Sequence, residues 1–160
     1  MLNVDAVMNW PFAEERRIYN EADCIRIAEG FGAGLPGALS QSDQRYLDPA
    51  RLQALPMMAV PLTDGEFWQQ HPDTGIVWQK ILHAAEAITV HRPLPTAGDL
   101  TLKQRVVQLL DRGPERGAVM IQRHNLSDAS GDLVTIDVTT VLRDNGGFGG
   151  EPDTRPREQW

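Results

Sequence analysis

Residues 77–95 read VWQKILHAAEAITVHRPLP, the longest apolar run of the chain. From Val77 to Val90 the residues alternate well enough to predict a β-strand, and apolar side chains fall on both of its faces. A strand of this kind is usually central in its sheet, with a layer packed above it and another below it. Pro93 and Pro95 are expected to end it, because proline cannot donate to a strand ladder.

The remaining pattern predicts one helix and several strands. Residues 20–31 have an apolar stripe at helical spacing, with Asn20 as N-cap and Asp23 in the capping-box position. A short strand is possible at 16–19, and three long strands are predicted at 100–110, 118–126 and 133–142, joined by the turn-rich segments DRGPERG and SDASGD. Long antiparallel strands twist and curl, so we expect an α+β fold whose curved sheet wraps around the helix at 20–31.

Length and composition bound the possible functions. The chain has 160 residues, which favours one domain; we set this domain at 1–145, followed by a Gly/Pro-rich, linker-like tail at 146–160. The net charge is −7 without a basic cluster, so nucleic acid is not an expected partner. No apolar run approaches the roughly 20 residues that span a bilayer, so no membrane is expected. One cysteine and no secretory signal favour the cytoplasm.

Several pieces of the sequence together resemble one family, the N-terminal half of two-domain MaoC-like dehydratases, or type 2 (R)-specific enoyl-CoA hydratases. The resemblance runs from about residue 10 to residue 150. The pieces occur in the right order and at the right intervals: Trp10-Pro11-Phe12; Gly32-Ala33-Gly34; Tyr46 with Leu52-Gln53-Ala54-Leu55-Pro56; Leu82-His83; 91–98 (HRPLPTAG); Asp111-Arg112-Gly113; and 146–150 (GGFGG).

This resemblance implies a hot-dog fold, a curved antiparallel sheet around a helix. In such enzymes two hot-dog halves pack as a pseudo-dimer, and the C-terminal half carries an Asp-x-Asn-Pro-x-His motif that activates water for addition to a trans-2-enoyl thioester. The chain has no Asp-x-Asn-Pro-x-His. We therefore assign no catalytic residue, no cofactor and no metal, with CoA expected only as part of the thioester substrate.

Binding residues can be carried over from the family to three positions. The family's Leu-His-Gly in this strand aligns with Leu82-His83-Ala84, which implies that His83 and Ala84 contact the acyl-CoA. The family's cation after Leu-Asp aligns with Arg112, whose guanidinium could form a two-pronged hydrogen bond with a phosphate. By itself, an arginine before Gly113 would be read as a solvated turn residue. The chain has Ala84 where the family often has glycine, and Met57 where it commonly has threonine.

The remaining polar residues, the cysteine and the glycines give weaker indications of function. On a regular strand Glu86 faces the side opposite His83, so the two are poor partners and we favour a structural or ligand-lining role for His83. His91 and His124 lack metal-site spacing and are expected to be solvated or interface groups. Cys24 belongs to the buried stripe of the helix and is expected to be structural. The glycines at 146–150 either approach a ligand through bare backbone or form a flexible exit from the last strand.

Two functions from different classes remain open. The first is the non-catalytic, acyl-CoA-binding half of an enoyl-CoA hydratase, paired with a hot-dog domain or subunit that supplies the Asp/His dyad. The second is a stand-alone acyl-thioester-binding or scaffold module, as a homodimer without turnover. A thioesterase that uses Glu66 or His83 is a weaker third possibility.

Overall fold

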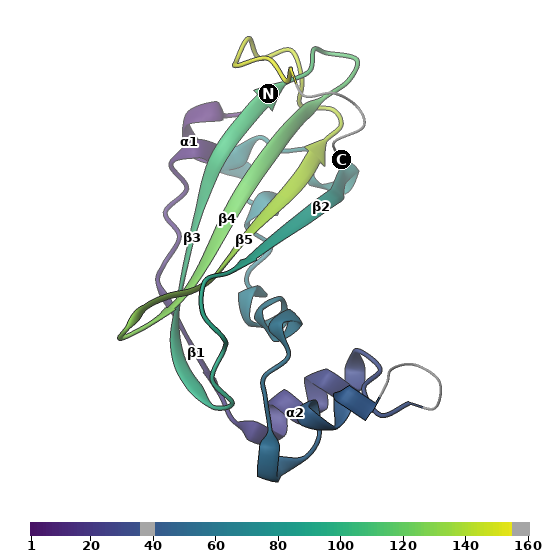
Figure 1. Cartoon of the computed structure of the whole chain (residues 1–160). Coiled ribbons are helices and arrows are strands. Elements are labelled where there is room, and N and C mark those ends of the chain that lie inside the picture. Colours follow the sequence, from purple (N-terminus) through teal and green to yellow (C-terminus); the bar gives the residue numbers. More distant parts are fainter. Residues whose placement is uncertain (36–40, 155–160) are drawn as a thin grey trace.

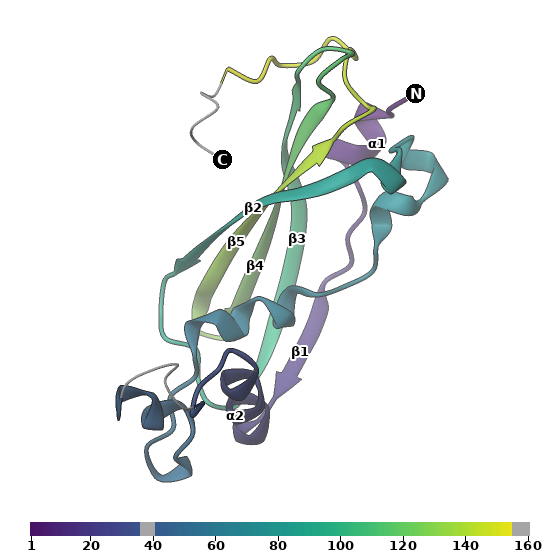
Figure 2. The same cartoon turned by 90° about the vertical axis from the view of Figure 1, so that its right-hand side faces the viewer.

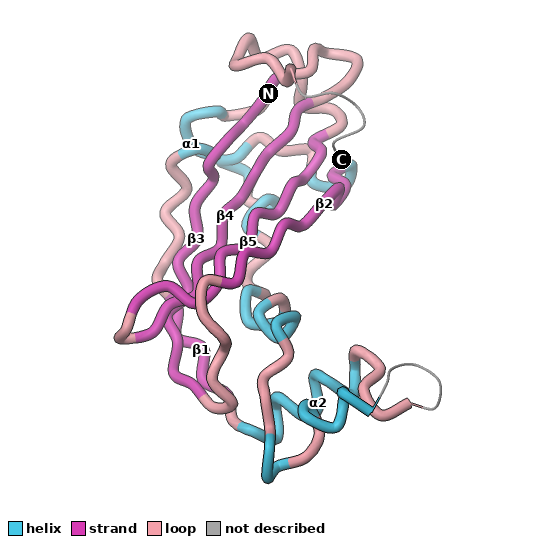
Figure 3. The backbone as a smooth tube through the Cα atoms, viewed as in Figure 1, coloured by secondary structure: helices cyan, strands magenta, loops and turns pink. Residues whose placement is uncertain are grey.

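A computed structural model describes residues 1–35 and 41–154 of the chain. Its main feature is a curved, five-stranded antiparallel sheet in the order β1-β3-β4-β5-β2 (Figures 1 and 3). The α+β plan expected from the sequence is confirmed. The strands and α-helices are α1 (Val4–Met8), β1 (Glu15–Tyr19), α2 (Glu21–Gly30), β2 (Ile81–Val90), β3 (Gly98–Asp111), β4 (Ala118–Asp128) and β5 (Gly131–Leu142).

Strands β3, β4 and β5 form a meander through the middle of the sheet, as the alternating pattern predicts. Gly113 and Gly117 in the β3–β4 turn have positive φ angles, and a Cβ on Gly117 would lie 2.4 Å from the carbonyl oxygen of Leu142. Glycine is therefore required there by both conformation and space. Asp128 and Gly131 close the second hairpin as its last paired residues.

Helix α2 begins as its sequence predicts. The Asn20 side chain accepts hydrogen bonds from the backbone N–H groups of Ala22 and Asp23, and Asp23 completes the capping box. Cys24 is buried and its thiol lies 3.3 Å from the sulfur of Met58. The position of α2 differs from our expectation in one respect: Figures 1 and 2 show it at one end of the sheet rather than along its middle.

Short 3-10 turns cover the rest of the same face of the sheet. Met58 and Ala59 in one of these turns are fully buried, against Leu102 and Ile136 of the sheet. We call the face that these turns cover the inner face; it lies behind the strands in Figure 1. The turns are Gln41–Tyr46, Pro49–Arg51, Pro56–Ala59, Pro61–Thr63, Trp68–Gln70, Pro72–Thr74 and Trp78–Lys80. Prolines within this segment explain why it forms short turns instead of one long helix.

The N-terminal arm packs its aromatic residues on the body of the protein. The ring centroids of Trp10 and Phe12 each lie 5.2 Å from that of Trp68. The arm also holds the short helix α1, which begins after Asn3 and buries Val7. The sequence pattern of the arm did not indicate this helix.

The prediction that residues 77–90 form a central strand is wrong. Strand β2 is shorter, and it lies at one edge of the sheet, where it pairs with β5 and with no other described strand. Most of its side chains are partly or fully exposed, including Leu82 at 47% and Val90 at 43%. Apolar residues on both faces therefore do not identify a central strand here, because the chain itself covers little of β2.

Candidate functional site

Two of the three predicted binding residues lie on β2, and the third lies elsewhere. His83 and Ala84 are near the start of β2, whereas Arg112 directly follows β3, so that β4 and β5 separate them. The Arg112 side chain is 16% exposed and its Nε lies 3.6 Å from the carboxylate of the buried Asp153. Arg112 is therefore held by the chain itself, and its contact with CoA stays a prediction.

A β-bulge changes which side chains of β2 share a face. His83 pairs with Thr140 and Ala85 with Thr139, so Ala84 is the extra residue. Because the bulge shifts the alternation by one residue, His83 and Glu86 both point to the inner face and line one cavity there. Our expectation that Glu86 faces away from His83 is therefore wrong. That expectation assumed that side chains alternate between the two faces at every residue, and a bulge interrupts this alternation.

His83 and Glu86 line what we call the polar cavity, a space of about 350 Å³ between the inner face and residues 60–69. Its rim consists of exposed residues and its floor of buried ones. It is lined by Val60, Thr63, Asp64, Gly65, Glu66, Phe67, Trp68, Gln69, His83, Glu86, Gln104, Gln122, His124 and Val138.

A chain of hydrogen bonds fixes the floor of the polar cavity. The indole Nε1 of Trp68 donates to Oε1 of Gln122 at 3.0 Å, and Nε2 of Gln122 donates to Oε1 of Gln104 at 2.9 Å. Trp68 is also wedged against the aromatic residues of the N-terminal arm. These contacts hold both amide groups in fixed orientations.

His124 lies beside these hydrogen-bonded residues, and it is 8% exposed. Its Nδ1 has no hydrogen-bond partner among the described residues. Burial lowers the pKa of His124 to about 4, although Asp137 and Asp64 act in the opposite direction. The ring is thus neutral at pH 7, and our expectation of a solvated or interface histidine is wrong. The inward alternation of Met120, Gln122, His124 and Leu126 is the sequence signal that could have placed it inside.

A second cavity, of about 440 Å³, lies at the far end of β2, next to Val90. We call it the apolar cavity, because most of its walls are hydrocarbon. It is lined by Tyr46, Leu52, Gln53, Ala54, Pro56, Val90, Pro93, Leu94, Pro95 and Thr96. Many of these residues belong to two of the sequence pieces that carry the family resemblance, and the fold brings those pieces together.

The glycines at 146–150 have a structural role that neither sequence-based reading anticipated. The backbone N–H groups of Gly147 and Gly149 donate to the Asp111 carboxylate at 2.7 Å each. The hydrogen bond from Gly147, followed by that from Gly113, lowers the pKa of Asp111, although desolvation opposes them. Residues 146–154 therefore dock on the β3–β4 turn. The domain boundary that we set at residue 145 stays a prediction.

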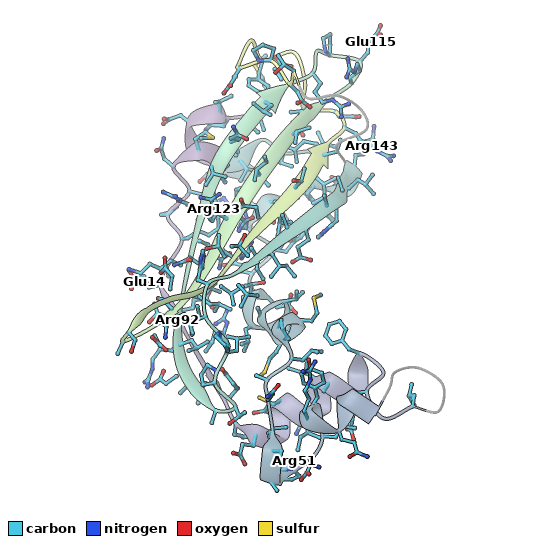
Figure 4. The ribbon with its side chains drawn as sticks, viewed as in Figure 1. Glu14, Arg51, Arg92, Glu115, Arg123 and Arg143 are labelled. Carbon is cyan, nitrogen blue, oxygen red and sulfur yellow. The ribbon has the colours of Figure 1, made fainter. Side chains whose placement is uncertain are left out.

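The outer face of the sheet carries paired charges. Figure 4 labels Arg123 over the middle of this face, where its guanidinium forms two hydrogen bonds of 2.7 Å with Asp137 on β5. Within residues 1–35 and 41–154, no group of three or more His, Cys, Asp or Glu side chains is placed to hold a metal ion. None of the helices in this part of the chain has the length and apolar character that crossing a membrane requires.

The fold is that of the MaoC-like hot-dog dehydratases. A solved MaoC-like dehydratase from Phytophthora capsici superimposes with a TM-score of 0.72 at 26% identity, covering 97% of this chain and 54% of that one. The chain belongs to the family described as the MFE-2 hydratase 2 N-terminal domain, whose model matches residues 18–144. This confirms the family and the hot-dog fold that the sequence pieces implied.

Two curated relatives support the same assignment. Peroxisomal enoyl-CoA hydratase 2 of Arabidopsis thaliana is 29% identical over 154 residues, which is 91% of this chain and 49% of the relative. The 3-hydroxyacyl-thioester dehydratase Y of Mycobacterium tuberculosis is 41% identical over 78 residues, 48% of this chain and 27% of the relative. The chain thus spans half or less of the length of the curated relatives it matches.

Proposed function

We propose that this chain is the non-catalytic, acyl-CoA-binding half of a (3R)-enoyl-CoA hydratase, and that a second hot-dog domain or subunit supplies the catalytic Asp/His pair. The membership of the chain in an N-terminal hydratase-domain family carries this proposal. The absence of Asp-x-Asn-Pro-x-His from the sequence agrees with it. In the reaction, the partner's Asp and His activate a water, whose hydroxyl adds to C3 of the trans-2-enoyl thioester while a proton adds to C2.

The unpaired edge of β2 is where we expect the partner to bind. An edge strand of ten residues with exposed apolar side chains can pair with a strand of another chain. The exposed apolar residues near this edge are Phe67, Trp78, Leu82 and Val90. The ring centroids of Phe67 and Trp78 lie 6.0 Å apart, so they form one apolar patch beside the start of β2.

The acyl group is expected to lie along the inner face beside β2. Val90 borders the apolar cavity, and His83 borders the polar cavity on the same strand. Ala84 is the extra residue of the β-bulge in β2, and we expect its methyl group to limit how closely a thioester can approach the backbone. In this arrangement His83 and Ala84 contact the substrate, and Arg112 binds a phosphate of CoA. The single buried cysteine fits a reducing compartment, so we propose the cytoplasm as the location.

The proposal is tested by hydration of crotonyl-CoA and of a longer trans-2-enoyl-CoA, followed by the loss of absorbance of the enoyl thioester. Three samples are compared: this chain, a hot-dog subunit that carries Asp-x-Asn-Pro-x-His, and their equimolar mixture. We expect this chain to be inactive alone and the mixture to hydrate the longer substrate faster than the subunit does by itself. Turnover by this chain alone would overturn the proposal. Acyl-CoA binding without any gain in the mixture would favour a stand-alone binding module.

A further inference from the structure

Two of the sequence pieces that carry the family resemblance form one structural unit. The first is Asp111-Arg112-Gly113, at the end of β3, and the second is the glycine-rich run at 146–150, which follows β5. The Asp111 carboxylate joins them, because it accepts backbone hydrogen bonds from both pieces. We call residues 146–154 the strap; Figures 1 and 2 show it, in yellow, at the end of the sheet where β3 and β4 meet.

The strap also pairs with the chain through its backbone. The N–H of Asp111 donates to the carbonyl oxygen of Glu151 at 2.7 Å, and the N–H of Asp153 donates to the carbonyl oxygen of Asp111 at 3.1 Å. These bonds accompany a short parallel bridge. Phe148 packs against the apolar cluster at this end of the sheet. Together these contacts place Asp153 directly beside Arg112.

The strap thereby brings a carboxylate to the cation that we expect to bind CoA. Oδ2 of Asp153 lies 3.6 Å from Nε of Arg112, and the two side chains are 2% and 16% exposed, respectively. A guanidinium recognises carboxylate and phosphate oxygens in the same way. While the strap is docked, Arg112 is both paired with a negative charge and largely covered. A phosphate can therefore reach Arg112 only when the strap has moved.

The contacts of the strap are those of a segment that can be displaced. Its residues are exposed or half-buried, whereas Leu109 and Leu110 in the strand that it follows across the turn are buried. The hydrogen bonds from Gly147 and Gly149 to Asp111 are exposed to solvent. Segments with few buried contacts and solvent-exposed backbone hydrogen bonds open at a lower free energy than core strands do. Opening of the strap thus does not require the sheet to unfold.

We propose that the strap regulates CoA binding: Asp153 closes the site by pairing with Arg112, and release of the strap exposes Arg112 to a phosphate of CoA. This inference rests on the proposed function, because it assumes that Arg112 binds CoA. Asp153 and CoA then compete for one guanidinium. Binding of CoA favours the open strap, and opening of the strap tightens CoA binding by the same factor.

The test is a calorimetric titration of the full chain with CoA. Asp153→Asn keeps the shape of the side chain but removes its charge, which destabilises the docked strap over the covered guanidinium. We expect CoA to bind about tenfold more tightly to this variant, as it would if the wild-type strap were open in about a tenth of the molecules. Adding Arg112→Gln to Asp153→Asn should abolish the gain.

Glu151→Gln is the matched control, because it removes the same charge from an exposed residue of the same strap. Its affinity for CoA should stay within about twofold of wild type. Phe148→Ala loosens the strap without changing any charge, so it should tighten CoA binding by a few-fold. In wild type, saturating CoA should speed amide hydrogen exchange at Gly147, Gly149 and Asp153, which a purely structural strap would not show.

Three results would overturn this inference and leave the proposed function intact. They are CoA binding by Asp153→Asn that is no tighter than that of wild type, a gain that survives Arg112→Gln, and strap amides whose exchange CoA does not change. Failure of wild type and of every variant to bind CoA or an acyl-CoA would overturn both the inference and the proposed function.

Discussion

The two edges of the sheet differ in length, in charge and in how they are tied to the rest of the chain. At one edge, β1 has five residues, ERRIY, of which three are charged. Arg16 forms an ion pair with Asp99, and Arg17 donates hydrogen bonds of 2.8 Å to the carbonyl oxygens of Leu62 and Asp64. A short, charged edge of this kind resists pairing with other strands.

At the other edge, β2 has twice that length and reads ILHAAEAITV, with a single carboxylate. Among the described strands its one neighbour is β5. The sheet therefore has one edge that is protected against association and one that is not. This asymmetry supports the proposal that a partner pairs at β2.

Placing charged residues on β2 should have the largest effect on partner binding, because it would make this edge resemble the charged edge at β1. We expect Leu82→Lys together with Val90→Lys to weaken binding of a catalytic hot-dog partner about a thousandfold, because two apolar contacts are lost and two charges must be desolvated. Ile18→Lys on β1 is the matched control, since Ile18 is an exposed apolar residue at the opposite edge. Its affinity should stay within about twofold of wild type. Calorimetric titration measures both, and equal losses would contradict the assignment of the edges.

Acid should destabilise the middle of the sheet through His124, which lies on β4. Its pKa is about 4 in the folded protein, below its ordinary value of 6.5, so the unfolded chain takes up the proton first. The contribution of His124 to stability is complete above pH 6.5 and is lost as the pH falls towards 4. We expect about 2 kcal/mol of the unfolding free energy to be lost in this way between pH 7.5 and pH 5.

The measurement is urea unfolding at both pH values for the wild type and for His124→Gln. The difference between the two proteins isolates His124 from the carboxylates Asp64, Glu66 and Glu86 that line the same cavity. His124→Gln should show a pH dependence that is smaller by the amount stated. Identical pH dependence in the two proteins would show that His124 is not buried as a neutral ring.

The bulge at Ala84 is a further difference between β2 and β1, because it bends β2 and places His83 and Glu86 on the same face. Deleting Ala84 removes the extra residue and leaves His83 opposite Thr140 and Ala85 opposite Thr139, so the side chains keep their faces while the local bend and twist of β2 are lost. We expect a loss of about 1.5 kcal/mol in the unfolding free energy, together with weaker partner binding. Ala87→Ser, which keeps the register, is the control. Wild-type stability and partner binding in the deletion variant would mean that β2 does not need the bend at the bulge.

The smallest effect is expected at the protected edge. The ion pair between Arg16 and Asp99 is exposed, and exposed pairs contribute little. Arg16→Ala should therefore change neither partner binding nor thermal stability beyond the error of the measurement. A large loss of partner binding would place the interface at β1 instead.

The sequence was informative where local chemistry decides the structure. Asn20 and Asp23 predict the start of α2, and the alternating runs predict β3, β4 and β5, because caps and strand faces depend on neighbouring residues. The family pieces also predicted the hot-dog fold, which no single element could.

Non-local features could not be predicted in the same way. The edge position of β2 depends on which strands pair, and apolar residues alone do not report what covers them. The inward turn of Glu86 depends on a bulge that has no clear residue signature at Ala84. The burial of His124 follows from the packing of Trp68 and the N-terminal arm over the inner face, far away in the sequence.

Amide hydrogen exchange tests the central claim most directly, with this chain measured alone and in a mixture with a hot-dog subunit carrying Asp-x-Asn-Pro-x-His. The account predicts that the amides of β2, at residues 81–90, exchange at least about tenfold more slowly in the mixture, because they gain strand or side-chain contacts. The amides of β1, at residues 15–19, should be unchanged. Slower exchange at β1 but not at β2, or no change at either edge, would contradict it.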